Sequence, residues 1–324
     1  MNKHILFAYL LDSKGGCKVL TDNQEISSQI KAEQLAWVHL NATHKKTKSW
    51  LNSELPYLDH YIVKALLAGE TRPRIVEIGD GILLNLRGAN LNENADPEDM
   101  ISLRLWIDDH RIISLQRRPL KAIKDIETKL LEAKGPENAG DFLCLLVQTL
   151  FERMEPILED LDAATDQVEE DILDNATPEQ REEVISIRKK AIMFRRYLAP
   201  QRDVINQFKN ITSSWLSANN RRSLIEDHDR MIRYLEDLDA IRERSQIVKD
   251  ELANILADRL NKNMYVLSVI AAIFLPLGFL TGLLGINVGG IPGAENSDAF
   301  IIFLGILVLI VAAQVVIFKK LKWF

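Results

Sequence analysis

Cysteine and histidine are scarce in this chain of 324 residues, which has 2 cysteines and 6 histidines. Cys17 and Cys144 lie far apart, and no Cys or His stands at the spacing of a structural zinc site. These absences argue against a disulfide framework, and reduced thiols suit a cytoplasmic body. The net charge of −6 gives no reason to expect nucleic acid as a partner.

Sequence motifs that carry catalysis are also missing. Residues 1–136 contain no phosphate-binding glycine loop, no Gly-x-Ser-x-Gly elbow and no His-Glu-x-x-His helix. The histidines of this part are scattered, and His39, inside an expected strand, is more typical of a core histidine than of a metal ligand. We therefore expect no enzymatic activity, and we interpret residues 1–136 as a sensing or packing domain.

Two stretches near the C-terminus have no Asp, Glu, Lys, Arg or His. They are residues 264–284 and 299–318, and each is close to the about 20 apolar residues that a helix needs to cross a bilayer. We expect two membrane spans, 261–284 and 299–318, joined by a loop at 285–298. Lys and Arg flank the pair on one side only, so the positive-inside rule places both chain ends in the cytoplasm and the loop outside. These residues are Arg259, Lys262, Lys319, Lys320 and Lys322, the last three in a basic tail at 319–324.

The first third of the chain alternates strand and helix patterns. The expected strands are 5–11, 18–20, 36–41, 74–78, 82–87, 101–107 and 111–116. Helical patterns cover 45–69, with an interruption at Pro56, and 120–133. Gly135-Pro136 ends the last of these helices, so we place the end of a cytoplasmic α/β domain at residue 136. The fold class is therefore α+β, followed by long helices and the two spans.

Helical periodicity is nearly continuous over residues 137–260, which we expect to form a cytoplasmic helical region. A first helix runs from Asp141 to about Leu173, and Thr177–Gln180 forms a capping box for the second. Pro200 predicts a kink or break in that helix near Leu198. A third helix begins near Asn220 and meets no breaker before Leu284, a rod on the order of 95 Å. Its apolar seam comprises Leu224, Met231, Leu235, Leu238, Ile241, Ser245, Val248, Leu252, Ile255 and Leu260.

Charge is divided between the first two of these helices. Residues 152–183 hold thirteen acidic residues against two arginines, whereas residues 188–209 hold seven basic residues against one aspartate. One interpretation is an antiparallel pair of helices with oppositely charged, solvated faces. The other is an acidic rim that concentrates cations near the cytoplasmic mouth of a pore.

Several segments resemble one family of membrane proteins. Gly285-Ile286-Asn287 closes the first span, after Phe274-Leu275-Pro276-Leu277 and before the glycine-rich Val288–Gly293. Together with Tyr197–Val204 and Thr71–Arg74, these segments are similar to the CorA superfamily of two-span, Gly-x-Asn divalent-cation transporters. CorA-type magnesium channels usually carry Gly-Met-Asn at this place. Ile286 and the glycine-rich loop are more similar to the ZntB branch, which is associated with zinc uptake.

The resemblance implies a funnel-shaped homo-pentamer in the inner membrane of a bacterium. It implies uptake of Zn²⁺ with no cofactor, through a pore lined by the first span, with proton coupling as one energy source and Mg²⁺, Co²⁺, Ni²⁺ and Cd²⁺ as further candidate ions. A CorA-type channel for magnesium, cobalt or nickel is the alternative transporter. A membrane-anchored scaffold or sensor, whose helices only transmit a signal, is the alternative from another class. Membrane lipid and further copies of the chain are the expected partners.

The family pattern also points to the residues that line the pore. They are Asn261, Met264, Leu267, Leu275, Gly278, Gly285, Ile286 and Asn287. A ring of Asn287 amides could hold a hydrated divalent cation through its water shell, although an asparagine here could also cap the helix. Gly278 could equally serve close helix approach. Glu295 and Asp298 in the outer loop either attract cations or simply keep the loop soluble.

Neither sulfur nor imidazole occurs between Tyr265 and Phe318, so soft ligands in the pore cannot select zinc over magnesium. The spans also lack carriers for an intramembrane proton relay. Four acids of the third helix are candidate metal ligands, although acids on a charged helix are more often solvated or paired. They are Asp227, Asp237, Asp250 and Asp258.

Overall fold

The computed structural model describes residues 3–69, 72–285, 291, 293 and 296–320. The chain divides into two compact units, residues 1–250 and residues 251–324. The first unit contains a mixed β-sheet, its covering helices and three long helices. The second contains the C-terminal part of the longest helix and one further helix.

A seven-stranded sheet organises the first unit, with the order β2-β1-β3-β7-β6-β5-β4. Only β3 and β7 pair in parallel among the described strand pairs, and their register places Ala36 opposite Arg111. Five strands have the predicted bounds, and the other two differ by one residue at each end. The strands are β1 (Ile5–Leu11), β2 (Cys17–Val19), β3 (Ala36–Asn41), β4 (Arg74–Ile78), β5 (Gly81–Gly88), β6 (Ile101–Ile107) and β7 (Arg111–Gln116).

Helices cover both faces of this sheet, so its central strands are largely buried; every residue of β6 is buried, including Ser102 and Arg104. On one face, Val38 belongs to a core cluster that also holds side chains of α1 (Asn23–Ile30), α2 (Lys45–Glu54) and α3 (His60–Leu67). On the other face, the ring of the neighbouring Trp37 packs edge-on against Phe142, with the ring centroids 4.9 Å apart. Side chains alternate along a strand, so adjacent residues of β3 build different cores.

His39 lies in β3 as a core residue. Its Nδ1 is 2.7 Å from the hydroxyl oxygen of Ser114, which also accepts a hydrogen bond from the indole of Trp37. Burial lowers the pKa of His39 to about 4. The ring is therefore neutral at physiological pH and acts as part of the sheet's core.

One of the shorter helices of the first unit differs from the sequence prediction. The predicted interruption at Pro56 is confirmed, because the pattern at 45–69 divides into α2 and α3 with Pro56 in the connection. Helix α1 was not predicted, because its sequence is mostly polar. Asp22 caps it by accepting hydrogen bonds from the backbone N–H groups of Gln24 and Glu25. The spacing Asp22-x-x-Glu25 is a capping signature that could have revealed this helix.

The long helices are α5 (Ala139–Asn175), α6 (Gln180–Gln207) and α7 (Ala218–Leu284), with α4 (Lys121–Leu131) before them and η1 (Phe208–Asn210) between α6 and α7. Of the predicted kink or break near Leu198, the break is wrong, because α6 continues through Pro200. Its buried face also continues past the proline, so packing holds the helix together. Of the predicted capping box, the side chain of Gln180 does accept a hydrogen bond from the Thr177 N–H at 2.8 Å.

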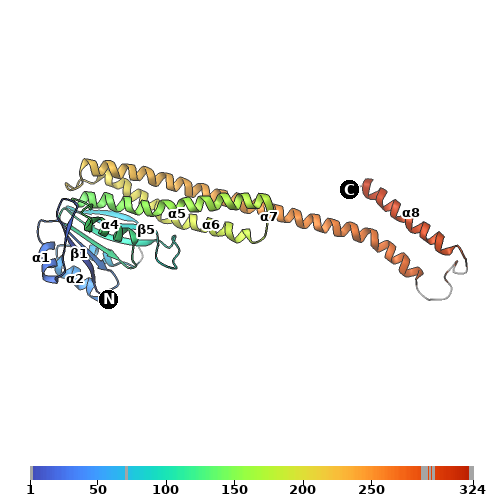
Figure 1. Ribbon diagram of the computed structural model, residues 1–324, viewed down its shortest axis with the longest axis horizontal. Coiled ribbons are helices and arrows are strands. Elements are labelled where there is room, and N and C mark those ends of the chain that lie inside the picture. Colours follow the sequence, from blue (N-terminus) through green and yellow to red (C-terminus); the bar gives the residue numbers. More distant parts are fainter. Residues whose placement is uncertain (1–2, 70–71, 286–290, 292, 294–295, 321–324) are drawn as a thin grey trace. The chain divides into compact units, whose positions relative to one another are not determined.

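Within the first unit, α5 and α6 lie alongside the first part of α7 (Figure 1). The predicted seam is buried from Leu224 to Leu252, whereas Leu260, in the second unit, is 60% exposed. The acids of α5 pair with α7 rather than with α6. Arg244 of α7 contacts three of them, namely Asp162, Asp166 and Glu169. Among the described residues no ion pair joins α5 to α6. The oppositely charged faces predicted for these two helices therefore do not contact each other through ion pairs.

Candidate functional site

The second unit is a hairpin of two apolar helices, the end of α7 and α8 (Ala299–Lys320). Both are long and apolar enough to cross a membrane, and almost none of their side chains are buried within the chain. One face of the α7 span packs on α8. Val269 is the most buried residue of that face, and Ile273, Leu277 and Leu280 are half-buried beside it.

The opposite face of the α7 span carries most of the predicted pore residues. Met264, Leu267 and Leu275 are 58%, 67% and 70% exposed, and a Cβ placed on Gly278 would meet no atom within 4 Å. With about 100° between successive helical residues, these four lie roughly opposite Val269. Asn261 precedes them and is also exposed. The fold thus gathers Met264, Leu267, Leu275 and Gly278 on one exposed stripe of the α7 span.

This exposed stripe offers few polar groups. The hydroxyl of Ser268 donates to the carbonyl of Met264 at 2.8 Å, and the hydroxyl of Thr281 donates to that of Leu277 at 2.9 Å. Both hydroxyls are therefore satisfied within their own helix. Any ion passing this surface would keep most of its water, because the described stripe supplies almost no oxygen ligands.

The C-terminal end of the α7 span is followed by a glycine. A Cβ on Gly285 would lie 2.7 Å from the backbone oxygen of Thr281, so a side chain here would force the backbone to shift. Ile286 and Asn287, the next two residues of the predicted motif, lie outside the described residues, as does Glu295 in the loop. Asp298 lies directly before α8 and is exposed, and its N–H donates to the Asn296 side chain at 3.0 Å.

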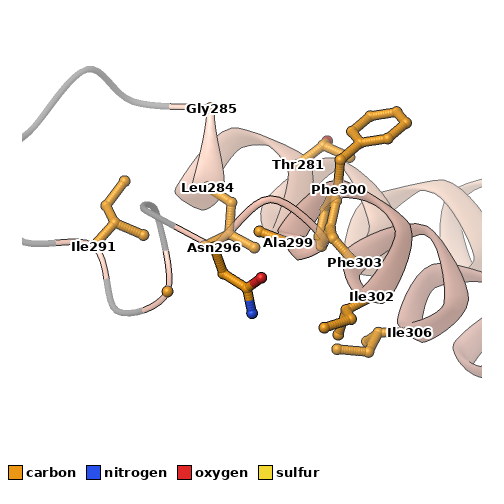
Figure 2. Close-up of a pocket in the computed structure, with 11 residues that line it drawn as sticks. Thr281, Leu284, Gly285, Ile291, Asn296, Ala299, Phe300, Ile302, Phe303 and Ile306 are labelled. Carbon is orange, nitrogen blue, oxygen red and sulfur yellow. The ribbon is translucent and has the colours of Figure 1, made fainter.

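A pocket of about 530 Å³ lies between this end of α7 and the start of α8 (Figure 2). Its lining is largely aliphatic and aromatic, and Asn296 is one of the few polar side chains that reach it. It has no charged side chain among its described lining residues, so it does not resemble a cation site. The residues shown in Figure 2 include Thr281, Leu284, Ile291, Asn296, Phe300, Phe303 and Ile306.

The four candidate acids of α7 are spread along the helix. Asp227 is buried, and desolvation raises its pKa to about 6. Asp237 also has a raised pKa, from desolvation and the nearby Asp162. Asp250 accepts hydrogen bonds from Gln246, and Asp258 is exposed. Within the described part of one chain, no three His, Cys, Asp or Glu side chains are arranged to hold a metal ion.

Sequence reasoning missed the roles of two polar residues. Arg244 was not singled out, although it links α7 to three acids of α5. Gln314 was not singled out either, and its amide nitrogen donates to the backbone oxygen of Ala272 at 3.2 Å. An isolated amide within an apolar span was the available signal for the second.

Comparisons with known proteins agree with this architecture. The chain is 38% identical to the zinc transport protein ZntB of Pectobacterium atrosepticum over 317 residues, which cover 98% of this chain and 95% of that protein. It is 35% identical to the divalent cation transporter CmaX of Pseudomonas aeruginosa, with 98% and 96% covered.

The fold agrees as well. The solved structure of full-length CmaX matches with a TM-score of 0.86 at 34% identity and covers 98% of both chains. The complete CorA magnesium transporter of Methanocaldococcus jannaschii has the same fold, with a TM-score of 0.79, at 18% identity and full coverage of both chains. The predicted α+β domain, long helices and two C-terminal apolar helices are therefore confirmed.

With two apolar helices and relatives that are membrane transporters, the chain is an integral membrane protein. The model of the CorA-like Mg²⁺ transporter protein family matches residues 32–320. The chain belongs to the CorA-like family of divalent-cation transporters.

Proposed function

We propose that this protein carries divalent metal cations across the membrane, with zinc as its main cargo, through a path lined by the α7 span. The observation that carries the proposal is the exposed, uncharged stripe of Met264, Leu267, Leu275 and Gly278 on the face away from α8. The choice of cargo is supported by relatives that are named as zinc transport proteins and match nearly the full length of this chain.

The path requires several copies of the chain. Two helices cannot enclose a hydrated channel, and the exposed stripe is free to face the same stripe of other copies around a common axis. A homo-pentamer is the assembly that the family resemblance favours. In that assembly, Asn261 marks the cytoplasmic end of the lining, and Gly285, Ile286 and Asn287 mark the outer end.

Selection takes place at the outer mouth in this proposal. One Asn287 amide from each copy forms a ring of oxygens that holds a cation through its hydration water, and Glu295 and Asp298 raise the local cation concentration. The apolar stripe then passes the ion without binding it tightly, which conduction requires. Asp227, Asp237, Asp250 and Asp258 remain candidates for metal contacts with another copy.

Orientation follows from the basic residues that flank the spans. Arg259, Lys262 and Lys319 support N- and C-termini in the cytoplasm, and the inner membrane of a bacterium is the site that the resemblance favours. Because residues 264–284 and 299–318 lack Asp, Glu, His and Lys, proton coupling has to act at the two mouths or in the cytoplasmic unit.

A magnesium channel is the second candidate, since the matching family is described by Mg²⁺ transport and the stripe has no soft ligand for zinc. Purified protein in sealed proteoliposomes decides between the two. We would measure Zn²⁺ and Mg²⁺ uptake with and without a pH gradient, at several membrane potentials. Zinc uptake supports the leading proposal, whereas magnesium flux driven by the potential alone supports the second.

Asn287→Ala tests the outer ring in the same vesicles. We expect uptake to fall by about tenfold or more, the effect of losing roughly 1.4 kcal/mol of ion binding. Asn296→Ala is the matched control, because it removes an amide from the same loop, one whose oxygen accepts a hydrogen bond from the nearby Asp298 N–H. Unchanged uptake in Asn287→Ala would remove the ring from the mechanism. Absence of any metal flux in the wild type would favour a scaffold or sensor.

A further inference from the structure

Pro276 interrupts the hydrogen bonding of the α7 span. In an α-helix, the N–H of each residue bonds the carbonyl four residues earlier, and proline has no N–H. The carbonyl of Ala272 therefore lacks its usual partner, although α7 continues from Ala218 to Leu284. Within a bilayer no water is available to replace that partner, so a neighbouring helix has to supply one.

Gln314 of α8 supplies this partner. Its Nε2 donates to the Ala272 oxygen at 3.2 Å, across 42 residues of sequence. Because that oxygen is the one that Pro276 leaves without its usual partner, the interhelical bond and the proline form one structural unit. The other amide atom of Gln314, Oε1, is buried and has no partner among the described residues.

Gln314 lies on the face of α8 that packs against α7. The more buried residues of α8 recur at helical spacing, and they include Gln314 itself. By contrast Ser268 and Thr281 of the α7 span donate their hydroxyls to carbonyls of their own helix. Gln314 makes a polar contact that joins the two helices of the hairpin. The residues on this face of α8 are Phe303, Leu307, Ile310, Val311, Gln314 and Phe318.

We infer that Gln314 is a positioning residue that fixes α8 to α7 at Pro276 by satisfying the freed Ala272 carbonyl, and thereby sets the geometry of the proposed pore lining. Pro276 lies between Leu275 and Gly278, which belong to the exposed stripe. A change in the backbone at Pro276 therefore moves that stripe directly. This inference rests on the proposed transport function for its consequence, but the hydrogen bond can be tested without transport.

The test is a cycle of three variants, Gln314→Met, Pro276→Ala and the double variant. Methionine keeps the length of the side chain and removes the amide donor. Alanine restores the N–H of residue 276, so the Ala272 carbonyl regains a partner within its own helix. If the inference is right, Gln314→Met lowers the stability of the folded protein when Pro276 is present. The same change has almost no effect on stability in the Pro276→Ala background.

The first readout is unfolding of the purified protein by SDS in mixed micelles. Interhelical hydrogen bonds in membranes change the unfolding equilibrium about threefold on average and up to about twentyfold. We expect Gln314→Met to change the unfolding equilibrium by a factor within this range. In the Pro276→Ala background the same substitution should change it less than twofold. Ser268→Ala is the control, because it removes a bond that stays within α7.

The second readout is metal uptake into proteoliposomes. We expect Gln314→Met to lower the maximum rate and to leave the metal concentration at half-maximal rate unchanged, because Gln314 does not touch the path. Pro276→Ala should remove this difference. Equal destabilisation by Gln314→Met in both backgrounds would overturn the inference. If Gln314→Met destabilises the protein only when Pro276 is present, but the wild type takes up no metal, the inference stands and the proposed function is contradicted.

Discussion

Gln201 of α6 makes two hydrogen bonds to the backbone of Arg87 in β5. Its Oε1 accepts from the Arg87 N–H at 2.6 Å, and its Nε2 donates to the Arg87 carbonyl at 3.2 Å. The neighbouring strand β4 begins at Arg74, opposite Asn85, so it does not reach Arg87. The side chain of Gln201 thus makes the two backbone hydrogen bonds that a longer β4 would make to Arg87, and it joins α6 to the sheet.

Gln201→Leu should destabilise the first unit by about 1–3 kcal/mol, because it removes both hydrogen bonds to the Arg87 backbone and puts an apolar group in their place. Gln201 is only 2% exposed, so water cannot replace it. Thermal unfolding of the detergent-solubilised protein, followed by circular dichroism, measures the change. Arg202→Ala is the control, since Arg202 pairs with the adjacent Asp203 at the surface. A similarly small decrease in the unfolding temperature of both variants would contradict this account.

Asp227 should make stability depend on pH. Its pKa is raised from 3.8 to about 6, chiefly by desolvation, and Glu226 adds to the effect whereas Arg230 opposes it. The folded protein therefore keeps a proton that the unfolded chain releases, so stability falls as pH rises from about 4 to 6 and is constant above. The loss is on the order of 1–3 kcal/mol.

Asp227→Asn should remove this dependence, because an amide does not ionise. Unfolding by denaturant at a series of pH values checks it, and we expect the variant to be more stable than the wild type at pH 7.5 and similar to it at pH 4. Asp250→Asn provides the comparison, since Asp250 is hydrogen-bonded to Gln246 on the helix surface. A wild-type stability that rises between pH 4 and 6 in step with that of Asp227→Asn would show that other groups dominate.

Arg244 should link α7 to α5 through charge. It lies 2.6 Å from Glu169 and also contacts Asp162 and Asp166, with its side chain 34% exposed. Arg244→Gln should cost about 1 kcal/mol, and the cost should shrink as salt is raised. Thermal unfolding at low and high ionic strength measures both. Arg242→Gln is the control, because Arg242 pairs with Asp239 of its own helix; equal effects would argue against an interhelical role.

The strands were predictable because β-branched and aromatic runs bounded by turns are local signals. The register was not, since β3 pairs with β7 about 70 residues later and only the folded sheet brings Ala36 to Arg111. Pro200 misled the prediction for a related reason. A proline weakens a helix locally, but the buried face of α6, which includes Leu198 and Gln201, continues on both sides of it.

The pore-lining role of the candidate residues stays a prediction. The family pattern selected Met264, Leu267, Leu275 and Gly278, and the structure exposes all four on one face of the α7 span. The contact between Gln314 and Ala272 could not be predicted, because it depends on how α7 and α8 pack. The same holds for Arg244, whose charge is one of many on a highly charged helix.

Gly278 offers the sharpest test of the lining, because it separates a pore from a packing role. If Gly278 faces the path, Gly278→Leu should reduce metal uptake by about tenfold or more while the oligomer stays intact, since a bulky side chain from each copy narrows the path. If Gly278 instead serves close helix approach, the same change should disrupt assembly. Gly305→Leu in α8 is the control, because a Cβ there also meets no atom within 4 Å. Uptake into proteoliposomes, together with the mass of the detergent-solubilised oligomer, distinguishes these outcomes. Normal uptake with a normal oligomer mass in Gly278→Leu would place the path on another face of α7.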